Sequence, residues 1–544
     1  MLLLEARQME KSYGDRLIFE AKKLEVFYGD RIGIVGQNGV GKSTLMHVLA
    51  GVEEPDSGQV NWYGSTALIQ QIDQGEDAAE TTRHARSMWG ISHVHSQMSG
   101  GETVRLKIAA ALEQQAPLLF ADEPTSHLDM AGIRQLEEAL LAYEGAVILI
   151  SHDRELLDTI CTRIWEVEDG KVCEYKGNYS EYREQKEKKR EREWFEYEEY
   201  RKEKERLSQA LIEIKQRAAG IRKAPKRMGN SEARLHKRKA NGKREKVERA
   251  AITLQSRLER LEKKEKPKEQ PVVRFDATSH GEQHGRTIIR VQDITRSVEE
   301  KTLFKRLSFS VRPGQRVALI GANGSGKSTL LSMIYSQADG IYVAPSSRVG
   351  YFSQTLSLLD ESKSIWHNVS ESSVHSETVI RTALARMLFK KDEIHKPISV
   401  LSGGERVKTA LAKVFLGDYN VLLLDEPTNF LDIPTQEELE RILLEFPGTI
   451  LFASHDRKLI HRLADAVLCL GEESTTLFCG TYQEYLDRKT KPKRGHEEER
   501  MVLETRLTDL IGRLSSPKLE QVEKEELEQA YRETLKQLRE MEKE

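Results

Sequence analysis

Short apolar runs alternate with amphipathic stretches along most of the chain, as in proteins built on a parallel β-sheet covered by helices. Residues 31–36 (RIGIVG) and 316–321 (RVALIG) are β-branched apolar runs that end in glycine and precede a helix-forming stretch. Residues 146–151 (AVILIS) form another short run, of the kind buried on both faces of a parallel sheet. The pattern therefore predicts an α/β domain in each half of the chain.

A different pattern fills the middle of the chain, where Glu, Lys, Arg and Gln dominate from about residue 180 to 270. Mostly apolar positions recur there at alternating spacings of three and four, in two sets separated by Gly220, Pro225 and Gly229-Asn230. The first set is Tyr197, Tyr200, Lys204, Leu207, Leu211, Ile214 and Ala218, and the second is Val247, Ala251, Leu254, Leu258 and Leu261. Two heptad seams around a break predict an antiparallel coiled-coil hairpin, with arms of about 57 Å at 1.5 Å per residue.

A weaker pattern of the same kind lies at the C-terminal end of the sequence. Leu503, Leu507, Leu510 and Leu514 precede Ser515-Ser516-Pro517, and Leu527, Tyr531, Leu535 and Leu538 follow. This pattern predicts a short helical extension, whose role we expect to be packing or contact with protein.

The two halves of the chain repeat the same motifs in the same order. The first half contains GQNGVGKST (36–44), MSGGE (98–102), LLFADEPTSHLD (118–129) and ILISHDR (148–154). The second contains GANGSGKST (321–329), LSGGE (401–405), LLLDEPTNFLD (422–432) and LFASHDR (451–457). Equivalent residues are 303 positions apart in the pairs Ser99 and Ser402, Glu123 and Glu426, and His152 and His455. Lys42 and Lys327 are only 285 apart, so the extra residues of the second copy lie between its phosphate loop and its SGGE segment.

These patterns divide the chain into five parts. We expect α/β domains at 1–178 and 287–488, a linker hairpin at 179–270 with a basic tip near 220–239, a connector at 271–286 and a C-terminal helical extension at 489–544.

The GxxxxGK[ST] segments predict two phosphate-binding loops. Their glycines let backbone N–H groups turn toward phosphate oxygens, the lysine adds charge at the β- and γ-phosphates, and the serine hydroxyl binds Mg²⁺. The predicted nucleotide-binding residues are Gly36, Asn38, Gly39, Gly41, Lys42, Ser43 and Thr44 in the first copy, and Gly321, Asn323, Gly324, Gly326, Lys327, Ser328 and Thr329 in the second.

An apolar strand that ends in Asp-Glu brings two carboxylates beside the phosphates in each copy. We expect Asp122 and Asp425 to hold Mg²⁺ together with the loop serines, directly or through water. Glu123 and Glu426 are placed to orient or deprotonate the attacking water. His152 and His455 follow a strand and are predicted to contact the γ-phosphate.

Three further positions complete the predicted sites. Gln71 and Gln354 follow a strand and are positioned to sense Mg²⁺ or the attacking water. Tyr13 is positioned to stack on adenine, although an aromatic residue on an edge strand is the structural alternative. The second copy has Val298 at that place, which would remove ring stacking there.

Composition excludes several classes of protein. With 38% hydrophobic and 31% charged residues the chain is expected to be soluble, and no apolar run approaches the roughly 18 residues of a spanning helix. The opening MLLLEARQMEKS does not resemble a secretory signal. The four cysteines show no CxxC spacing and are expected to be reduced thiols, so we expect a cytoplasmic protein.

Positive charge is concentrated at the predicted tip of the hairpin. Residues 215–249 carry 14 Lys or Arg and three Glu, a net charge of +11 in a chain whose net charge is −3. Such an excess favours contact with nucleic-acid phosphates, with an acidic protein, a membrane surface or a solvated face as alternatives. Charge alone does not distinguish RNA from DNA. The tip residues predicted to bind the nucleic acid or act near it are Arg222, Lys223, Lys226, Arg227, Met228, Arg234, Lys237, Arg238 and Lys239.

SGGE next to DEPT…LD and SHD resembles the ATP-binding cassette superfamily, in which the signature segment completes the nucleotide site of the opposite cassette. The resemblance implies that residues 36–44 face 401–405 and that residues 321–329 face 98–102, closing on two ATP molecules with Mg²⁺. The N-terminus of each signature helix would then present N–H groups to a γ-phosphate. The signature residues implied are Ser99, Gly100, Gly101, Glu102, Ser402, Gly403, Gly404 and Glu405.

Two cassettes on one chain with a charged coiled-coil linker resemble the ABC-F family of cytosolic, ribosome-binding ATPases over nearly the whole chain. The resemblance implies a monomer with intramolecular cassette pairing and no membrane partner. Its linker would enter the exit-tRNA site of the 70S ribosome, among 23S rRNA, P-site tRNA and exit-site ribosomal proteins.

The resemblance is greatest to the antibiotic-resistance members of the Vga, Vml and Lsa kind. Gln71 and Ser99 are only 28 residues apart, against 48 for Gln354 and Ser402, so the arm that many members insert in the first cassette does not fit. We therefore hypothesise ribosome protection against lincosamides, streptogramins A or pleuromutilins.

Ser126 and Phe430 depart from the family's usual DEPTNHLD and, with Val298, argue against equal turnover at the two sites. The alternatives are a housekeeping ABC-F translation factor, the ATPase subunit of a membrane transporter, and a DNA-repair cassette ATPase. The last of these usually carries zinc-binding cysteines, which the sequence lacks.

Overall fold

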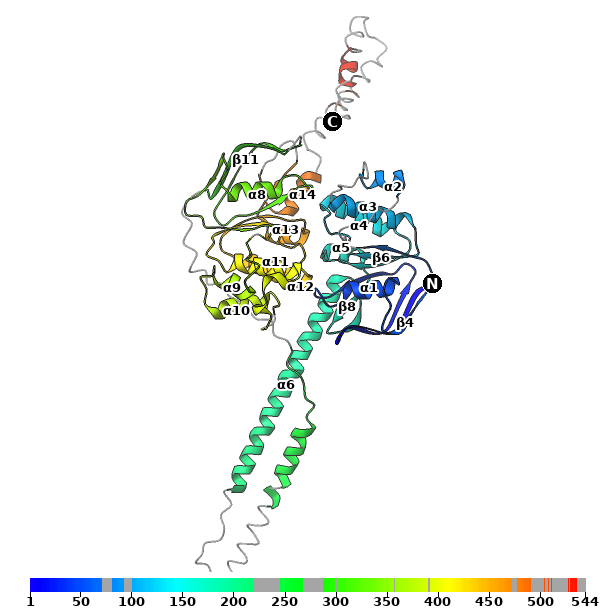
Figure 1. Cartoon of the computed structure of the whole chain (residues 1–544), viewed down its shortest axis with the longest axis vertical. Coiled ribbons are helices and arrows are strands. Elements are labelled where there is room, and N and C mark those ends of the chain that lie inside the picture. The colour runs from blue at the N-terminus through cyan, green and yellow to red at the C-terminus, as the bar shows by residue number, and fades with distance from the viewer. Residues whose placement is uncertain are drawn as a thin grey trace, which may run out of the picture.

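The computed structural model describes residues 1–70, 81–91, 100–219, 245–247, 249–267, 287–298, 301–356, 358–389, 392–471 and 477–490, together with 503, 507, 510, 527 and 529–535. Two α/β lobes lie side by side, and a long helix projects away from them (Figure 1). We call the elements from β1 to β9 the first lobe and those from β10 to α14 the second lobe. Gln71, Ser99, the basic tip and the connector lie outside the described residues.

The first lobe is built on a nine-stranded sheet with the order β4-β1-β2-β9-β8-β3-β7-β6-β5. Strands β8, β3, β7, β6 and β5 pair in parallel, whereas β1 pairs antiparallel with β2 and β4. The strands are β1 (Leu2–Tyr13), β2 (Arg16–Phe27), β3 (Arg31–Val35), β4 (Ser57–Trp62), β5 (Thr66–Ile69), β6 (Leu118–Asp122), β7 (Ala146–Ile150), β8 (Arg163–Glu168) and β9 (Lys171–Lys176). The helices are α1 (Lys42–Ala50), α2 (Arg83–Met88), α3 (Gly100–Glu113), α4 (Met130–Ala142) and α5 (Arg154–Ile160).

The second lobe repeats this plan with its strands divided between two sheets, ordered β11-β10-β13 and β14-β15-β16-β12-β17-β18. The strands are β10 (Ile289–Val298), β11 (Lys301–Val311), β12 (Arg316–Ile320), β13 (Ile341–Val343), β14 (Val349–Phe352), β15 (Val421–Asp425), β16 (Thr449–Ala453), β17 (Ala466–Cys469) and β18 (Leu477–Cys479). The helices are α8 (Lys327–Tyr335), α9 (Ile365–Ser370), α10 (Glu377–Arg386), α11 (Gly403–Phe415), α12 (Ile433–Glu445), α13 (Arg457–Leu463) and α14 (Tyr482–Thr490), with 3₁₀ turns at Glu393–His395 and Ile398–Val400. Between its phosphate loop and its signature segment the second lobe has α9, α10 and these turns, where the described part of the first lobe has α2.

The central strands are buried on both faces, which confirms the predicted α/β class. Every residue of β6, β7, β15 and β16 is buried. In β7, Val147 and Leu149 join the apolar cluster on one face of the sheet, and Ile148 and Ile150 join the cluster on the other. Such strands need helices on both sides, because a strand that is apolar throughout has no face to leave in water.

The two cores also interlock through one apolar residue from each lobe. Ile433 of α12 belongs to the buried cluster of the first lobe, which includes Tyr179 and Tyr182. Met130 of α4, which lies 303 positions earlier, packs against the buried cluster of the second lobe. The lobes therefore pair in a nearly twofold symmetric way.

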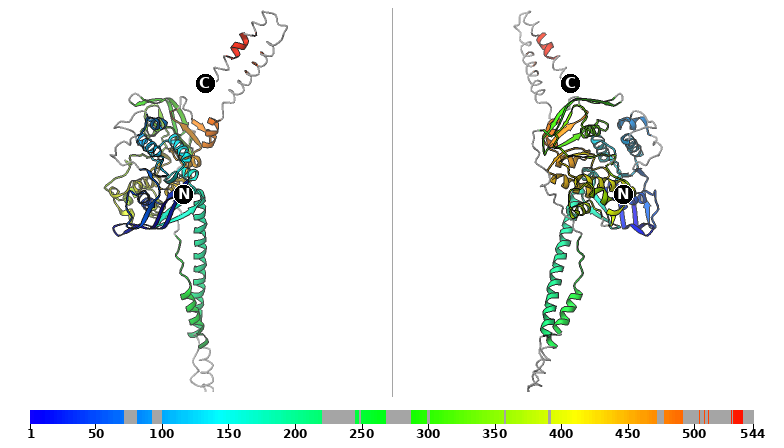
Figure 2. Two further views of the ribbon diagram at one scale, coloured as in Figure 1. Left: turned by 90° about the vertical axis from the view of Figure 1, so that its right-hand side faces the viewer. Right: turned by 60° about the vertical axis from the view of Figure 1, so that its left-hand side comes forward.

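The described parts of the linker form an antiparallel pair of helices, seen at one end of the molecule in Figure 2. Helix α6 (Tyr179–Ala219) has 41 residues, and residues 245–247 and 249–260 are helical. Arg257 pairs with Glu203 at 3.4 Å and Lys264 pairs with Glu196 at 3.4 Å. From Arg257 to Lys264 the second arm advances by seven residues, while the partners on the first arm go back by seven, from Glu203 to Glu196. This is the register of an antiparallel coiled coil.

The predicted seam is correct except at one position of the first arm. Leu207 is buried, whereas Lys204 is exposed and Glu203 is half-buried in its place. The physical reason is that Glu203 forms an ion pair with Arg257 of the other arm, in addition to one with Arg206 of its own helix. All five predicted positions of the second arm are half-buried, and the side chain of Ala218 lies outside the described residues.

In the C-terminal extension the predicted apolar positions that the structure describes are all helical: Leu503, Leu507, Leu510, Leu527, Tyr531 and Leu535. Among the described residues of the whole chain, no helix combines the length and the apolar composition that crossing a bilayer requires.

Candidate nucleotide sites between the lobes

Each phosphate loop connects a buried strand to a helix that starts without a side-chain cap. The loop after β3 leads into α1 through Gly41, and the loop after β12 leads into α8 through Gly326. The uncapped N–H groups at the start of these helices are free to bind an anion. Gly36 has φ 154°, and a Cβ there would lie 2.5 Å from the carbonyl oxygen of Val167, so no other residue fits.

The loop lysines lie at the centre of these loops. Lys42 Nζ donates hydrogen bonds to the carbonyl oxygens of Gly36 at 3.0 Å and Gln37 at 3.1 Å. Lys327 Nζ donates to the carbonyl oxygen of Gly321 at 2.8 Å and lies 3.1 Å from His455 Nε2. Burial lowers the pKa of both lysines, and the charge of the neighbouring glutamate partly offsets this effect. A phosphate that enters the loop therefore meets a poorly solvated positive charge, which strengthens its attraction.

A serine and an aspartate form the candidate Mg²⁺ site of each copy. Ser328 Oγ donates to Asp425 Oδ1 at 3.0 Å, and Ser43 is a hydrogen-bond partner of Asp122. Burial raises the pKa of both aspartates, which a nearby cation would reverse. Among the described residues there is no group of three His, Cys, Asp or Glu that could form an all-protein metal site. One hydroxyl and one carboxylate suit Mg²⁺, which takes its other ligands from water and phosphate oxygens.

The candidate catalytic glutamates are held in a strained backbone conformation. Glu123 and Glu426, which directly follow the ends of β6 and β15, have φ values of 48° and 50°. Their backbone N–H groups donate to the carbonyl oxygens of Ile150 at 3.0 Å and Ala453 at 2.9 Å, which fixes this conformation. Strain of this kind persists where the surrounding structure fixes a side chain for function.

Each glutamate contacts the histidine of its own lobe that is predicted to reach the γ-phosphate. His152 Nε2 lies 3.2 Å from Glu123 Oε1, and His455 Nε2 lies 3.4 Å from Glu426 Oε1. Burial raises the pKa of both glutamates to about 7. Burial also lowers the pKa of both histidines to about 3, so the imidazoles are neutral at physiological pH.

Two aspartates that the sequence analysis did not assign to the sites join each loop to the opposite lobe. Asp432 Oδ2 accepts a hydrogen bond from the backbone N–H of Asn38 at 2.8 Å. Asp129 Oδ2 accepts the equivalent bond from Asn323 at 3.4 Å. Their other oxygens cap α12 and α4, and this N-cap position after DEPT was the only sequence signal available.

The asparagine side chains make a second cross-lobe contact at each site. Asn38 Nδ2 donates to the carbonyl oxygen of Phe430 at 3.0 Å, and Asn323 Nδ2 donates to that of His127 at 2.7 Å. His127 and Phe430 have φ values of 62° and 64°, a conformation that turns these carbonyls toward the opposite lobe. The residue that accepts this bond is Phe430 at the first loop and His127 at the second, so the two sites differ in the side chain at this position.

The signature glycines face the loops that the cassette resemblance assigns to them. A Cβ on Gly404 would lie 3.3 Å from Asn38 Nδ2, and one on Gly101 would lie 3.5 Å from Asn323 Nδ2. Ser402 caps α11 in a capping box with Glu405, so Glu405 supports the helix start. Glu102 lies in the first turn of α3.

One cavity of about 1110 Å³ connects the two sites. It brings together most of the predicted residues: Tyr13, Asn38, Gly39, Gly41, Lys42, Ser43, Thr44, Gly100, Gly101, Asp122, Glu123, His152, Asn323, Gly324, Gly326, Lys327, Ser328, Thr329, Gln354, Gly403, Gly404, Glu426 and His455. The predicted residues Gly36, Gly321, Asp425, Ser402, Glu102 and Glu405 do not line the cavity.

Tyr13 is oriented by its neighbours at the mouth of the first site. Its hydroxyl donates to Glu53 Oε1 at 2.7 Å, and Lys11 Nζ lies 5.7 Å from the ring centroid. Tyr13 is 52% exposed, which leaves room for a stacking partner. Val298 closes the β10–β11 hairpin opposite Lys301, as Tyr13 closes the β1–β2 hairpin opposite Arg16. The second site therefore has no ring at this position.

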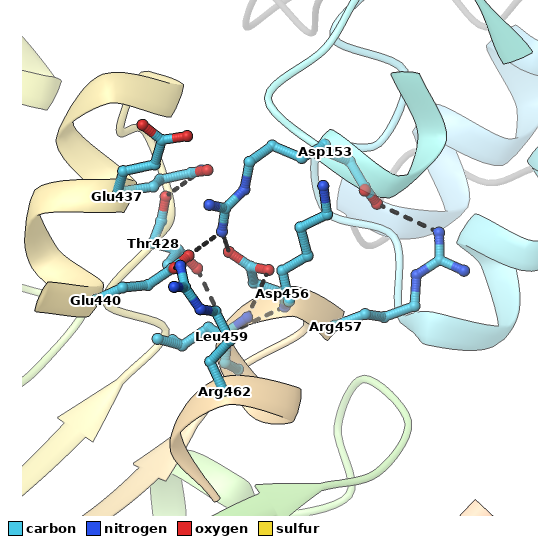
Figure 3. Close-up of polar contacts among 12 residues, drawn as sticks. Asp153, Thr428, Glu437, Glu440, Asp456, Arg457, Leu459 and Arg462 are labelled. Carbon is cyan, nitrogen blue, oxygen red and sulfur yellow. Dashed lines mark hydrogen bonds and ion pairs between the residues drawn. The ribbon is translucent and has the colours of Figure 1, made fainter. Parts of the chain in front are cut away.

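Reciprocal arginines join the lobes directly behind the histidines. Arg154 pairs with Glu440, and with Asp456 at 3.5 Å. Arg457, which lies 303 positions later, pairs with Glu137 at 3.1 Å and Asp153 at 3.8 Å (Figure 3). Asp153 and Asp456 directly follow the two histidines, so the residue after each histidine is tied to the arginine of the other lobe. Removing one partner of such a buried pair is costly, whereas the intact pair mainly fixes the arrangement.

Comparisons with known proteins agree with this geometry. The ABC transporter family model matches residues 19–92, 70–126 and 304–429. The chain is 34% identical to "Ribosome protection protein VmlR" of Bacillus subtilis, over 97% of this chain and 96% of that protein. It is also 34% identical to "Erythromycin resistance ATP-binding protein MsrA" of Staphylococcus epidermidis, over 80% of this chain and 90% of that protein. A crystal structure of an archaeal ribosome recycling factor, aABCE1, in complex with stalk protein aP1 has the same fold, with a TM-score of 0.61 and 20% identity over 88% of this chain and 91% of that one.

The raised pKa of the glutamates predicts a pH dependence. Below pH 7 Glu123 and Glu426 hold a proton and cannot accept one from water, whereas the neutral histidines do not titrate above about pH 3. We expect single-turnover ATP hydrolysis to rise through pH 7 and to fall about tenfold per unit below it, because a single base is titrated. The E123Q/E426Q variant should be slow at every pH, and a parent rate unchanged between pH 6 and 8 would contradict this assignment.

Tyr13 predicts unequal nucleotide affinity at the two sites. Replacing it with alanine removes a stacking face worth about 1–3 kcal/mol. We expect calorimetric titration of the full chain with a non-hydrolysed ATP analogue to show one weakened site of two. Tyr13→Phe and Val298→Ala should change neither site, and an unaltered titration for Tyr13→Ala would exclude stacking.

Proposed function

The chain belongs to the ABC-F family of tandem ATP-binding cassette proteins, and we propose that it is a cytoplasmic ATPase that protects the bacterial ribosome from antibiotics. Each lobe is one cassette. In this proposal the protein binds the 70S ribosome at the exit-tRNA site, and the tip of its linker displaces drugs that act at the peptidyl transferase centre.

The observation that carries this proposal is the completion of each nucleotide site by the opposite cassette of the same chain. Asn38 and Asn323 each bind an aspartate of the other lobe, and Gly404 and Gly101 face them. Two ATP molecules held between such surfaces favour the paired lobes, and their hydrolysis weakens the pairing. A single chain can therefore act as a monomeric ATP-driven switch.

The chemistry follows from the positions of the side chains. The loop N–H groups with Lys42 or Lys327 hold the β- and γ-phosphates, and the opposite signature helix directs its N-terminus at the γ-phosphate. Ser43 and Asp122, or Ser328 and Asp425, would hold Mg²⁺, which would neutralise charge that builds up on the phosphates. Glu123 or Glu426 orients the attacking water and accepts its proton, and the neutral imidazole beside it donates a hydrogen bond to the γ-phosphate.

The linker supplies the partner chemistry in this proposal. The net charge of +11 over residues 215–249 suits the phosphates of 23S rRNA and P-site tRNA. The names of the two relatives, a ribosome protection protein and an erythromycin resistance protein, support both a ribosomal partner and a role in resistance.

The central test uses the E123Q/E426Q variant, which should bind two ATP molecules without hydrolysing them and so keep the lobes paired. We expect it to co-sediment with 70S ribosomes in ATP but not in ADP, because only the paired form presents the linker in a fixed direction. Washed membranes serve as the control for a transporter subunit. Failure to bind ribosomes in ATP would refute the proposal.

Drug protection is tested separately, in a susceptible host that expresses the protein. We expect resistance to lincosamides, streptogramins A or pleuromutilins, and loss of that resistance in Met228→Ala or in chains shortened within residues 224–230, with ribosome binding retained. Ribosome binding without any resistance would indicate a housekeeping translation factor. Loss of binding together with resistance in the tip variants would show that the tip anchors the protein rather than acting on the drug site.

A further inference from the structure

The root of the linker helix, residues 179–186 of α6, is attached to the first lobe by side chains of its own half. Tyr182 donates a hydrogen bond to Glu166 Oε1 at 2.5 Å, and Lys186 pairs with the same glutamate and with Glu168 at 3.1 Å. Glu166 is 4% exposed and lies in β8, at the centre of the first lobe. These contacts are within one lobe and do not depend on pairing of the lobes.

The same root is also held by the second lobe. Lys458 Nζ of α13 lies 2.9 Å from Asp158 Oδ2 of α5. Asp158 in turn accepts hydrogen bonds from the backbone N–H of Ser180 at 2.6 Å and from its hydroxyl at 2.8 Å, so it bridges Lys458 to the start of α6. One turn further along, Arg183 of α6 pairs with Glu437 of α12. Figure 1 shows α6 leaving the body between the lobes, next to α12.

These contacts lie close to the second nucleotide site along the chain. Lys458 follows His455 by three residues, and the imidazole of His455 lies 3.1 Å from the loop lysine, Lys327. Helix α13 begins between them at Arg457, which is tied to Asp153 across the interface (Figure 3). A movement of the His455 segment therefore moves Lys458 as part of one short helix.

The duplication provides an internal comparison, because it extends into the root itself. GNYSEY (177–182) and GTYQEY (480–485) are again 303 positions apart, so α14 is the counterpart of the root of α6. The counterparts of the contacting residues are Glu155 for Lys458, His461 for Asp158, Leu486 for Arg183 and Arg134 for Glu437.

Neither ion pair has an equivalent at α14. Leu486 and Arg134 cannot form one, Glu155 pairs with Arg457 at 2.7 Å, and His461 packs edge-on against Tyr482 with 4.9 Å between ring centroids. The reciprocal arginines, by contrast, are present in both halves. Among the described residues, the contacts of the two arginines with Glu440, Asp456, Glu137 and Asp153 thus repeat in both halves, whereas these two ion pairs have no counterpart on the side of α14.

We propose that Lys458–Asp158 and Arg183–Glu437 form a clamp through which pairing of the lobes fixes the direction of the linker. In each pair one residue (Arg183 or Asp158) lies on the side of the first lobe and the other (Glu437 or Lys458) belongs to the second lobe. Separation of the lobes therefore breaks both pairs. The Tyr182–Glu166 bond remains, and the root then pivots on the first lobe. Lys458 and Arg183 are thus positioning residues, which set the direction of the linker. The inference rests on the proposed function only for the partner on which the linker acts.

Hydrogen exchange of the full chain, measured by mass spectrometry without ribosomes, tests the clamp directly. In the E123Q/E426Q background we expect ATP to slow exchange in residues 179–186 and in both phosphate loops. Adding Lys458→Ala and Arg183→Ala should reduce the slowing at 179–186 by about fivefold, as expected for two partly exposed ion pairs, and leave the loops slowed. The conservative variant Lys458→Arg with Arg183→Lys should restore the slowing at 179–186. Exchanging the partners, Arg183→Glu with Glu437→Arg, should restore the contribution of the Arg183–Glu437 pair.

A matched control removes two ion pairs of α6 that face solvent. Lys188 and Arg192 pair with Glu184 and Glu196 within the helix, so Lys188→Ala with Arg192→Ala should leave the effect of ATP at 179–186 unchanged. Full slowing at 179–186 in the clamp variant would overturn the proposal. Simultaneous loss of slowing at the loops would also overturn it, because the pairs would then merely hold the lobes together.

A ribosome assay separates this inference from the proposed function. With the natural glutamates present, the clamp variant should hydrolyse ATP in solution at the parent rate but lose ATP-dependent ribosome binding or drug protection. If the exchange results are as expected while the parent shows no ribosome binding, the clamp stands and the proposed partner is wrong. If the clamp variant protects ribosomes as well as the parent, the clamp does not govern the output.

Discussion

The structure depends on the pairing of two homologous surfaces within one chain. Neither nucleotide site is complete in its own lobe, because each phosphate loop takes its closing contacts from an aspartate, a carbonyl and a helix N-terminus of the other. Asp432 illustrates the balance of forces. Burial raises its pKa, yet the charge of Lys408 and hydrogen bonds from Thr435 and Asn38 outweigh that effect and lower it. The carboxylate therefore stays charged in a buried interface, where it accepts the backbone of the opposite loop and caps its own helix.

Burial at this interface also sets the chemistry. It removes water from Glu123, Glu426 and the two histidines, which leaves the imidazoles neutral and brings the glutamates close to the pKa of a base that works at neutral pH. The backbone strain at Glu123 and Glu426 is sustained because the neighbouring strand holds their N–H groups. Each lobe thus organises its own acid–base groups, and burial excludes solvent from them.

The duplication repeats some of the contacts between the lobes and not others. Three pairs of equivalent residues make the same contact to the opposite lobe: Met130 and Ile433, Arg154 and Arg457, and Asp129 and Asp432. The two copies differ at three other places: Tyr13 corresponds to Val298, His127 corresponds to Phe430, and the root of α6 carries ion pairs that the root of α14 lacks. In the proposed function, the symmetric contacts close the switch as a whole, and the asymmetric ones distinguish its two sites and its two helical extensions.

The sequence by itself determined the α/β class, the duplication, the phosphate loops, the Asp-Glu pairs and the antiparallel direction of the linker. These are consequences of local periodicity and of motifs that act within a few residues. The sequence placed Lys204 in the heptad seam, because spacing alone cannot register that Glu203 has a partner on the other arm. Asp129, Asp432, Arg154 and Arg457 lie within the repeated motifs, but the motifs alone assign them no role. Only the tertiary structure could do so, because their partners lie about 190 to 400 residues away or across the interface, and contacts between surfaces so distant along the chain leave no periodic signal. The same holds for the clamp at the root of α6, which exists because Asp158, Lys458, Arg183 and Glu437 meet where the two lobes and the linker join.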